Sequence, residues 1–157
     1  MLKRQSTLLS LAALGEIDRL SFIKAGTILD EARNRRKAFD YDLAVRRSQE
    51  AFELYLKSLF RFLQTEYPAS HDLRKQVYEL SEVLRDSQIT PQQVARLVLA
   101  NKVLKLWRSP AFYGDERLNV ASLFDSKEAE LALSYAELGQ LVCNIVRSQL
   151  YRRATTA

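Results

Sequence analysis

The sequence predicts an all-α protein of about five to six helices with no sheet. Three observations support this prediction. Apolar residues recur with helical spacing through most of the chain, which places them on single helix faces. The 157 residues include only four glycines and three prolines, which suits long helices with short connections. The length suffices for one domain with one sizeable core, and hydrophobic residues make up 47% of the chain, close to the average of globular proteins.

Residues 1–15 are expected to form an N-terminal helical extension, and residues 16–157 the main helical domain. The basic start and the apolar run of about seven residues look like a signal peptide, but Ser10 interrupts the run. We interpret the segment as an extra amphipathic helix that packs on the rest of the protein or on a partner.

The segment from Glu16 to Ala38 predicts the next helix. Ile17 and Leu20 lie on one of its faces, and the apolar residues that follow lie on the adjacent face. The end of this helix is the densest basic stretch of the chain. Together with two arginines that follow it, this basic cluster comprises Arg33, Arg35, Arg36, Lys37, Arg46 and Arg47. The helix dipole favours cations in a last turn, so the cluster is either a solvated helix end or a phosphate-facing patch for a nucleotide or RNA.

The central helix is expected from Asp40 to Glu66. Its apolar face is wider than one neighbour could cover, so this helix should contact most of the others. On its polar side, Glu53 precedes Lys57 by four residues, the favourable orientation for an ion pair within a helix.

Further helices are expected over residues 70–84 and 90–107 and from residue 125 onward. Two of these starts carry the residues of a capping box, Thr90 with Gln93 and Asp125 with Glu128. Asn101 falls among the apolar positions of its helix and would need a hydrogen-bond partner if buried.

Residues 108–125 show neither helical nor strand period and predict a loop of about eighteen residues, which is long for a compact bundle. Loops of this length are typically functional or ordered by another chain. We therefore expect a homodimer in which this partner loop is partly buried. The residues of this loop that we expect to contact the partner are Arg108, Phe112, Tyr113, Asp115 and Glu116. Adjacent acidic residues in a loop are usually solvated, so Asp115 and Glu116 are not expected to form a metal site.

Three motifs resemble the core signature of HEPN domains, which are small helical domains. The motifs are Tyr41-Asp42-x-Ala44, Ala51-x-Glu53-x-x-x-Lys57-Ser58-Leu59 and Pro68-x-Ser70-His71-Asp72-Leu73. The similarity covers residues 16–150. It implies an antiparallel helical bundle of four core helices plus the extra N-terminal helix, usually homodimeric, with Glu53, Lys57 and His71 as structural motif residues. It also implies a role in nucleotide or RNA transactions, often beside a minimal nucleotidyltransferase in toxin–antitoxin pairs.

The ribonucleases of this family carry an Arg-x4–6-His motif at the dimer interface, and this chain lacks it. After Arg108, the places where the histidine could stand hold Tyr113, Gly114 and Asp115. His71 is the only histidine, and it lies at a helix start, where its charged form is disfavoured. Catalytic residues are therefore not assigned, with His71, Arg108 and Tyr113 as the weak candidates, and enzyme activity stays open although the missing motif argues against it.

Other features limit the function classes further. Cys143 is the single cysteine, so an internal disulfide is impossible and a cytoplasmic location fits best. No glycine-rich phosphate-binding motif is present, and we expect no cofactor and no membrane contact. The net charge of +5 permits a polyanionic partner without requiring one.

The sequence thus favours a non-catalytic, HEPN-like binding protein. Its expected partner is a nucleotide, an RNA or a minimal nucleotidyltransferase in a toxin–antitoxin-type or stress system. Two alternatives stay open: a metal-independent ribonuclease with a non-standard active site, and a structural helical adaptor.

Overall fold

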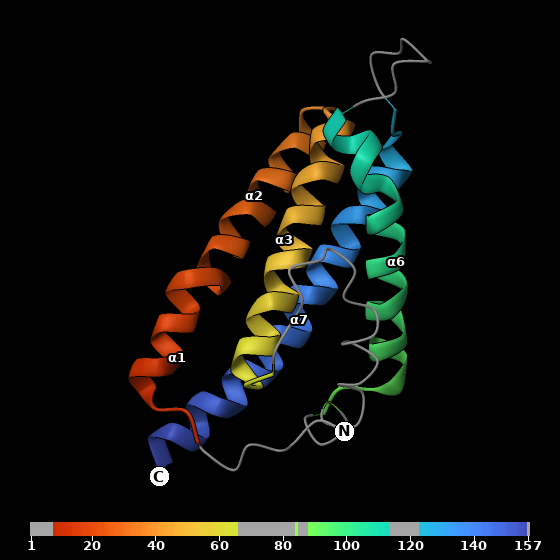
Figure 1. Cartoon of the computed structure of the whole chain (residues 1–157). Coiled ribbons are helices and arrows are strands. Elements are labelled where there is room, and N and C mark those ends of the chain that lie inside the picture. The colour runs from red at the N-terminus through yellow and green to blue at the C-terminus, as the bar shows by residue number, and fades with distance from the viewer. Residues whose placement is uncertain (1–7, 66–83, 85–87, 114–122, 157) are drawn as a thin grey trace.

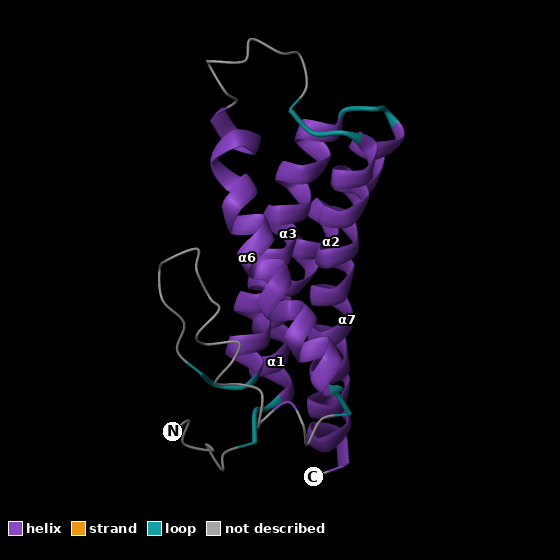
Figure 2. Cartoon of the chain, turned by 90° about the vertical axis from the view of Figure 1, so that its right-hand side faces the viewer, coloured by secondary structure: helices purple, strands orange, loops and turns teal. Residues whose placement is uncertain are grey.

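The computed structural model describes residues 8–65, 84, 88–113 and 123–156, with side chains to residue 108 in the third of these segments. The described elements are α1 (Leu11–Ile17), the π-helical turn η1 (Asp18–Phe22), α2 (Ile23–Lys37), α3 (Tyr41–Phe62), α6 (Pro91–Tyr113) and α7 (Ser126–Thr156). Throughout these segments every regular element is a helix (Figure 2). The predicted all-α fold is confirmed.

Helix α3 lies at the centre of the bundle and packs on α2, α6 and α7 (Figure 1). The helix directions alternate along the chain, so that α2 is antiparallel to α3, α6 to α3, and α7 to α6, while α3 and α7 run parallel (Figure 1). Most of the apolar face of α3 is buried, including Tyr55, Phe60 and Phe62. The expectation that the central helix would contact most of the others is confirmed for the described helices.

The first helical stretch is continuous from α1 through η1 into α2. Ser10 begins it as N-cap, since its side chain accepts a hydrogen bond of 3.1 Å from the Ala13 N–H. A π-helical turn holds one extra residue, which shifts the buried face of the helix by part of a turn. Leu20, which was expected on the apolar face, is therefore 53% exposed, whereas Ser21 is fully buried. The expected domain boundary after residue 15 falls inside this helical stretch, and the separate N-terminal extension stays a prediction.

Both capping boxes are confirmed by reciprocal hydrogen bonds. The Gln93 N–H donates to the Thr90 hydroxyl at 3.1 Å and the Thr90 N–H to the Gln93 side chain at 2.9 Å. The Glu128 N–H donates to the Asp125 carboxylate at 2.8 Å, and the return bond is 3.1 Å. Each pair satisfies two backbone donors that a helix start otherwise leaves open, which fixes where α6 and α7 begin.

Asp42 of the first HEPN-like motif joins the start of α7 to α3. Its carboxylate accepts hydrogen bonds of 2.9 Å from the backbone N–H groups of Leu123 and Phe124. Further along the same contact, Gly139 lets α7 approach α3 closely, because a Cβ at that position would lie 3.2 Å from the Phe52 ring. The motif residue and the glycine therefore set the spacing of the two helices.

Two expected boundaries differ from the structure. The central helix ends at Phe62 instead of Glu66. Helix α6 continues to Tyr113 instead of ending near Trp107, so the first part of the expected loop is helical. Backbone hydrogen bonding extends a helix beyond its apolar period, which is why the pattern placed this end too early. The helix expected over 70–84 lies almost wholly outside the described residues. None of the described helices has the length and apolar character of a membrane span.

Candidate functional site

The arginines of the basic cluster that belong to α3 contact carboxylates of α2 and α3. Arg47 donates to Glu50 at 2.7 Å and lies 3.1 Å from Glu31 of α2. Arg46 lies 3.5 Å from Glu50, one turn away on the same helix. The pKa of Arg47 is raised above its usual value by the hydrogen bond to Glu50, although burial opposes this.

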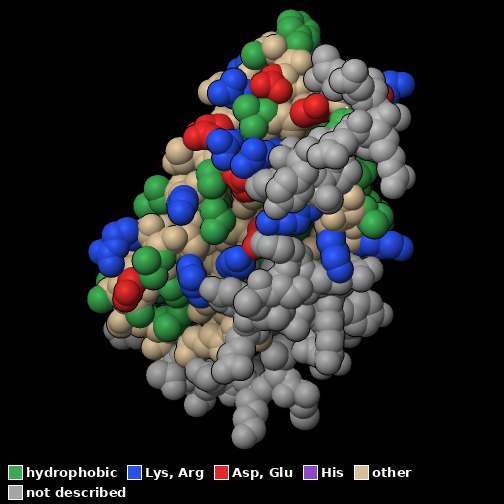
Figure 3. Space-filling view, turned by 45° about the horizontal axis from the view of Figure 1, so that its top comes forward, with side chains coloured by type: hydrophobic (Ala, Val, Ile, Leu, Met, Phe, Trp, Pro, Cys, Tyr) green, Lys and Arg blue, Asp and Glu red, His purple; other side chains and the backbone are tan. Residues whose placement is uncertain are grey.

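The arginines of the basic cluster that belong to α2 reach toward α7 and the start of α3. Arg33 lies 2.9 Å from Asp30 and 3.4 Å from Glu137 of α7. Two more pairs follow, Arg36 with Glu130 at 3.5 Å and Arg35 with Asp40 at 3.8 Å. Figure 3, which brings this end of the bundle forward, shows red acidic side chains among the blue basic ones.

The charge of the basic cluster is therefore balanced locally. Its five arginines face six carboxylates, those of Asp30, Glu31, Asp40, Glu50, Glu130 and Glu137. Lys37 is exposed, and no carboxylate of the described segments pairs with it. A phosphate group approaching this surface would meet acidic groups as well as basic ones, which weakens the electrostatic attraction.

A second cationic region lies between α3 and α6. The predicted pair Glu53–Lys57 is confirmed, with the Lys57 ammonium donating to the Glu53 carboxylate at 2.7 Å. Arg108 of α6 approaches the other oxygen of Glu53 at 3.7 Å. The structure thus brings together a structural motif pair of α3 and a residue that the sequence assigned to the partner loop.

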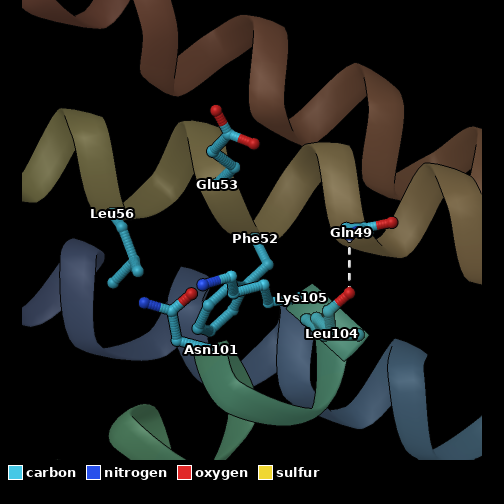
Figure 4. A pocket seen from close by; sticks show the side chains of 7 residues that line it. All are labelled: Gln49, Phe52, Glu53, Leu56, Asn101, Leu104 and Lys105. Carbon is cyan, nitrogen blue, oxygen red and sulfur yellow. Dashed lines mark hydrogen bonds between the residues drawn. The ribbon is translucent and has the colours of Figure 1, made fainter. Parts of the chain in front are cut away.

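Beside this group is a small hollow between the two helices (Figure 4). Its lining residues come from α3 and α6: Gln49, Phe52, Glu53, Leu56, Asn101, Leu104 and Lys105. Figure 4 shows Gln49 reaching across to α6, where its amide donates to the Leu104 carbonyl oxygen at 2.6 Å. The Gln49 Oε1 is buried without a hydrogen-bond partner in the described structure. We call this region, with Lys57 and Arg108 at its border, the α3–α6 hollow.

The α3–α6 hollow combines positive charge, amide groups and an apolar floor. Among its described residues Lys57, Lys105 and Arg108 are cationic, and Glu53 is the single carboxylate. Asn101, which falls among the apolar positions of its helix, is buried. Cations of this kind suit a phosphate-bearing ligand, because they supply charge and hydrogen-bond donors together.

The described residues offer no general base suited to cleave RNA in this hollow. Glu53, its carboxylate, is held by Lys57 and Arg108. Elsewhere, burial raises the pKa of the Cys143 thiol well above its usual range, and burial likewise raises the pKa of Tyr55 to about 12. Both groups therefore stay protonated at neutral pH. In the part of the chain that the structure describes, no group of three or more potential ligands is placed to hold a metal ion.

A buried polar group at the π-helical turn was not anticipated from the sequence. Asp18 accepts hydrogen bonds of 2.7 and 2.8 Å from the Arg147 guanidinium and of 2.5 Å from the Tyr151 hydroxyl. Burial alone would raise the pKa of Asp18, but these hydrogen bonds outweigh it and hold the pKa below its usual value. The Arg147 guanidinium also stacks over the Phe22 ring at 4.8 Å.

The extra residue of the π-helical turn turns Asp18 and Ser21 toward the core, and Ser58 of α3 donates to Ser21 at 2.6 Å. The sequence pattern that indicates this turn is the shift of the apolar residues to another helix face after Leu20. The partners of Asp18 are 129 and 133 residues away along the chain, so no local pattern could identify them.

Several predicted site residues fall outside the description. His71, Asp115 and Glu116 lie outside the described residues. Phe112 and Tyr113 end α6, and their side chains are not described. The partner loop and the role of His71 therefore stay predictions.

The fold and the motif contacts together define a small helical-bundle domain. In it Asp42 connects the central helix to the start of α7, and Glu53 pairs with Lys57 on the central helix. The family model of the HEPN domain matches residues 19–146. The chain belongs to the HEPN family, as the motifs predicted. No curated protein matches the chain in a sequence comparison.

Proposed function

We propose that this HEPN protein is a non-catalytic binding protein whose α3–α6 hollow recognises a phosphate-bearing ligand, either a nucleotide or an RNA. The observation that supports it most is the gathering of three cations there, Lys57, Lys105 and Arg108, beside Glu53 as the carboxylate of the described residues. Phosphate contacts by Lys and Arg supply most of the affinity in sequence-independent nucleic-acid binding.

The hollow fits this role better than the basic cluster does, because carboxylates accompany the arginines of the cluster. RNA contacts by the basic cluster stay a prediction, and the experiment below compares the two regions directly.

Binding without cleavage is the second part of the proposal. The Arg-x4–6-His motif is missing from the sequence, and Glu53 is occupied by cations. A homodimer and an assembly with a minimal nucleotidyltransferase, in a toxin–antitoxin-type or stress system, complete the proposal. These two assemblies are inferred from membership of the HEPN family. A molar-mass measurement by light scattering tests the homodimer.

The experiment is a fluorescence-anisotropy titration with a labelled single-stranded RNA, run beside a titration with ATP. The test variant is Lys105→Gln with Arg108→Gln, which removes two cations without placing new acidic groups next to Glu53. We expect binding of the favoured ligand to weaken by about tenfold or more, because two phosphate contacts are lost. Circular dichroism checks that the fold is intact.

The matched control is Arg35→Gln with Arg36→Gln, which removes the same charge from the basic cluster. We expect this variant to bind like the wild type. Equal binding by the Lys105→Gln/Arg108→Gln variant and the wild type would contradict the α3–α6 hollow as the site. Incubation of the labelled RNA with wild-type protein should leave it intact, and cleavage that His71→Ala abolishes would establish the ribonuclease instead.

A further inference from the structure

The outward side of α6 carries large apolar side chains that are exposed to solvent. Leu99 is 49% exposed and Leu106 is 68% exposed, and Ala95, also exposed, lies one turn before Leu99. Residues at these spacings share one side of a helix. Asn101 and Leu104, which line the α3–α6 hollow, are buried on the other side. The exposed apolar residues are therefore separate from the proposed phosphate site.

Cations border these apolar residues on both edges. At about 3.6 residues per turn, Lys102 lies toward one edge and Arg96 toward the other. Both are exposed, and neither has a carboxylate partner within the described segments. The whole of α6, Pro91–Tyr113, contains no Asp or Glu. We call Ala95, Leu99 and Leu106 with these two cations the α6 stripe.

We propose that the α6 stripe docks an acidic amphipathic helix of another protein. Protein interfaces place apolar side chains at the centre and polar groups at the rim, and the stripe has this arrangement. Leu99 and Leu106 would pack against apolar side chains of the partner helix. Arg96 and Lys102 would pair with its carboxylates, which complement a helix that has no acidic residue of its own.

Other occupants fit the stripe less well. The phosphates of an RNA would pair with Arg96 and Lys102, but they would not cover Leu99 and Leu106, which would stay exposed to water. A second copy of the chain in a two-fold arrangement would bring these cations toward their own equivalents, which repel. An anionic membrane surface would attract the cations, but a membrane-surface helix needs a wider apolar face than Leu99 and Leu106 provide.

The test uses a synthetic peptide as the probe and the full-length protein. The peptide has roughly 20 residues, enough to form a helix, with a leucine stripe flanked by glutamates. A second peptide carries lysine in place of every glutamate. We expect the wild type to bind the glutamate peptide in preference to the lysine peptide. Hydrogen exchange should slow at residues 95–106 when the glutamate peptide is bound.

Two variants separate the apolar part from the charged part. Leu99→Gln with Leu106→Gln should weaken binding of the glutamate peptide by about tenfold, since it removes the centre of the contact. Arg96→Glu with Lys102→Glu should invert the preference, so that the lysine peptide binds more tightly. The matched control is Leu20→Gln with Ile23→Gln, which removes an apolar pair of similar exposure from η1 and α2 and should change nothing.

The outcomes that overturn the proposal are distinct from those that concern the hollow. Equal loss of peptide binding in the Leu20→Gln/Ile23→Gln control would show non-specific adhesion. A dimer that dissociates on Leu99→Gln/Leu106→Gln would make a second copy the occupant. Binding to phosphatidylserine vesicles that the same variant abolishes would make it a membrane surface. Loss of RNA binding in Arg96→Glu/Lys102→Glu would make RNA the occupant of the α6 stripe.

The Lys105→Gln/Arg108→Gln variant should bind the glutamate peptide like the wild type, whether or not its RNA binding is weakened.

Discussion

The two cationic regions of the bundle differ in what surrounds their Lys and Arg side chains. In the basic cluster, arginines of α2 and α3 lie within ion-pair distance of carboxylates from α2, α3 and α7. Along α6, four cations share a helix that has no acidic residue, and the described carboxylate that faces one of them is Glu53 of α3. The first region joins helices of the bundle, while the second has several cations and a single carboxylate among the described residues of the α3–α6 hollow.

This difference shows that a dense run of Lys and Arg does not by itself mark a polyanion-binding surface. The fold determines which carboxylates lie next to the cations. Glu137, for example, is 104 residues after Arg33 in the sequence but lies beside it in the structure. Cations with such partners should affect stability when they are changed. Changes to the cations of the α3–α6 hollow should affect binding. The predictions below test that division.

The largest effect on stability is expected at Asp18, whose partner Arg147 is the least exposed of the paired arginines that the structure describes. Asp18→Ala should lower the free energy of unfolding by about 2–3 kcal/mol, because the partly buried guanidinium loses its carboxylate. RNA binding should not change. Urea denaturation measures the first quantity and the anisotropy titration the second. A loss below about 0.5 kcal/mol would contradict a structural role, since exposed pairs such as Arg35–Asp40 contribute that little.

The same carboxylate predicts a dependence of stability on pH. The pKa of Asp18 is lower in the folded protein than in the unfolded chain, so the folded state favours its charged form. Its contribution is fully present above the unfolded pKa and is lost as the pH falls through the folded pKa. The stability difference between wild type and Asp18→Asn should therefore shrink toward zero in acid. A difference that stays constant from neutral pH to strong acid would contradict this assignment.

Much of the fold could be predicted because its determinants are local. The apolar spacing of α3, the pair Glu53–Lys57 and the capping boxes at Thr90 and Asp125 each depend on residues within a few positions of one another. Local hydrogen bonds and helical periodicity fix such features before any tertiary contact forms.

The candidate site was less predictable because its determinants are distant. The sequence located the basic cluster but not Glu130 and Glu137, which α7 brings back to it. It also gave no indication of the role of Asp18, since only the π-helical turn directs that side chain inward. Arg108 was assigned to a loop because the apolar period ends before it, whereas the backbone of α6 continues.

The smallest effects are expected at two glycines of the described helices. Gly15→Ala should stabilise the protein by about 0.5–1 kcal/mol, because Ala favours a helix and a Cβ there meets no atom within 4 Å. Gly139→Ala should gain little or lose stability, because its Cβ would lie 3.2 Å from the Phe52 ring and 3.4 Å from Tyr55. Thermal denaturation followed by circular dichroism compares the two. A larger gain at Gly139 than at Gly15 would contradict the close approach of α7 to α3 that holds the carboxylates near the basic cluster.

The most direct test of the division between the two regions is the salt dependence of RNA binding. The logarithm of the binding constant is measured against the logarithm of salt concentration for the wild type and two variants. For Lys105→Gln with Arg108→Gln we predict a slope smaller in magnitude by about 1.4, because two phosphate contacts to a single strand are lost. For Arg35→Gln with Arg36→Gln we predict the wild-type slope. A smaller slope in the second variant, with the first unchanged, would contradict the assignment and place the phosphate contacts in the basic cluster.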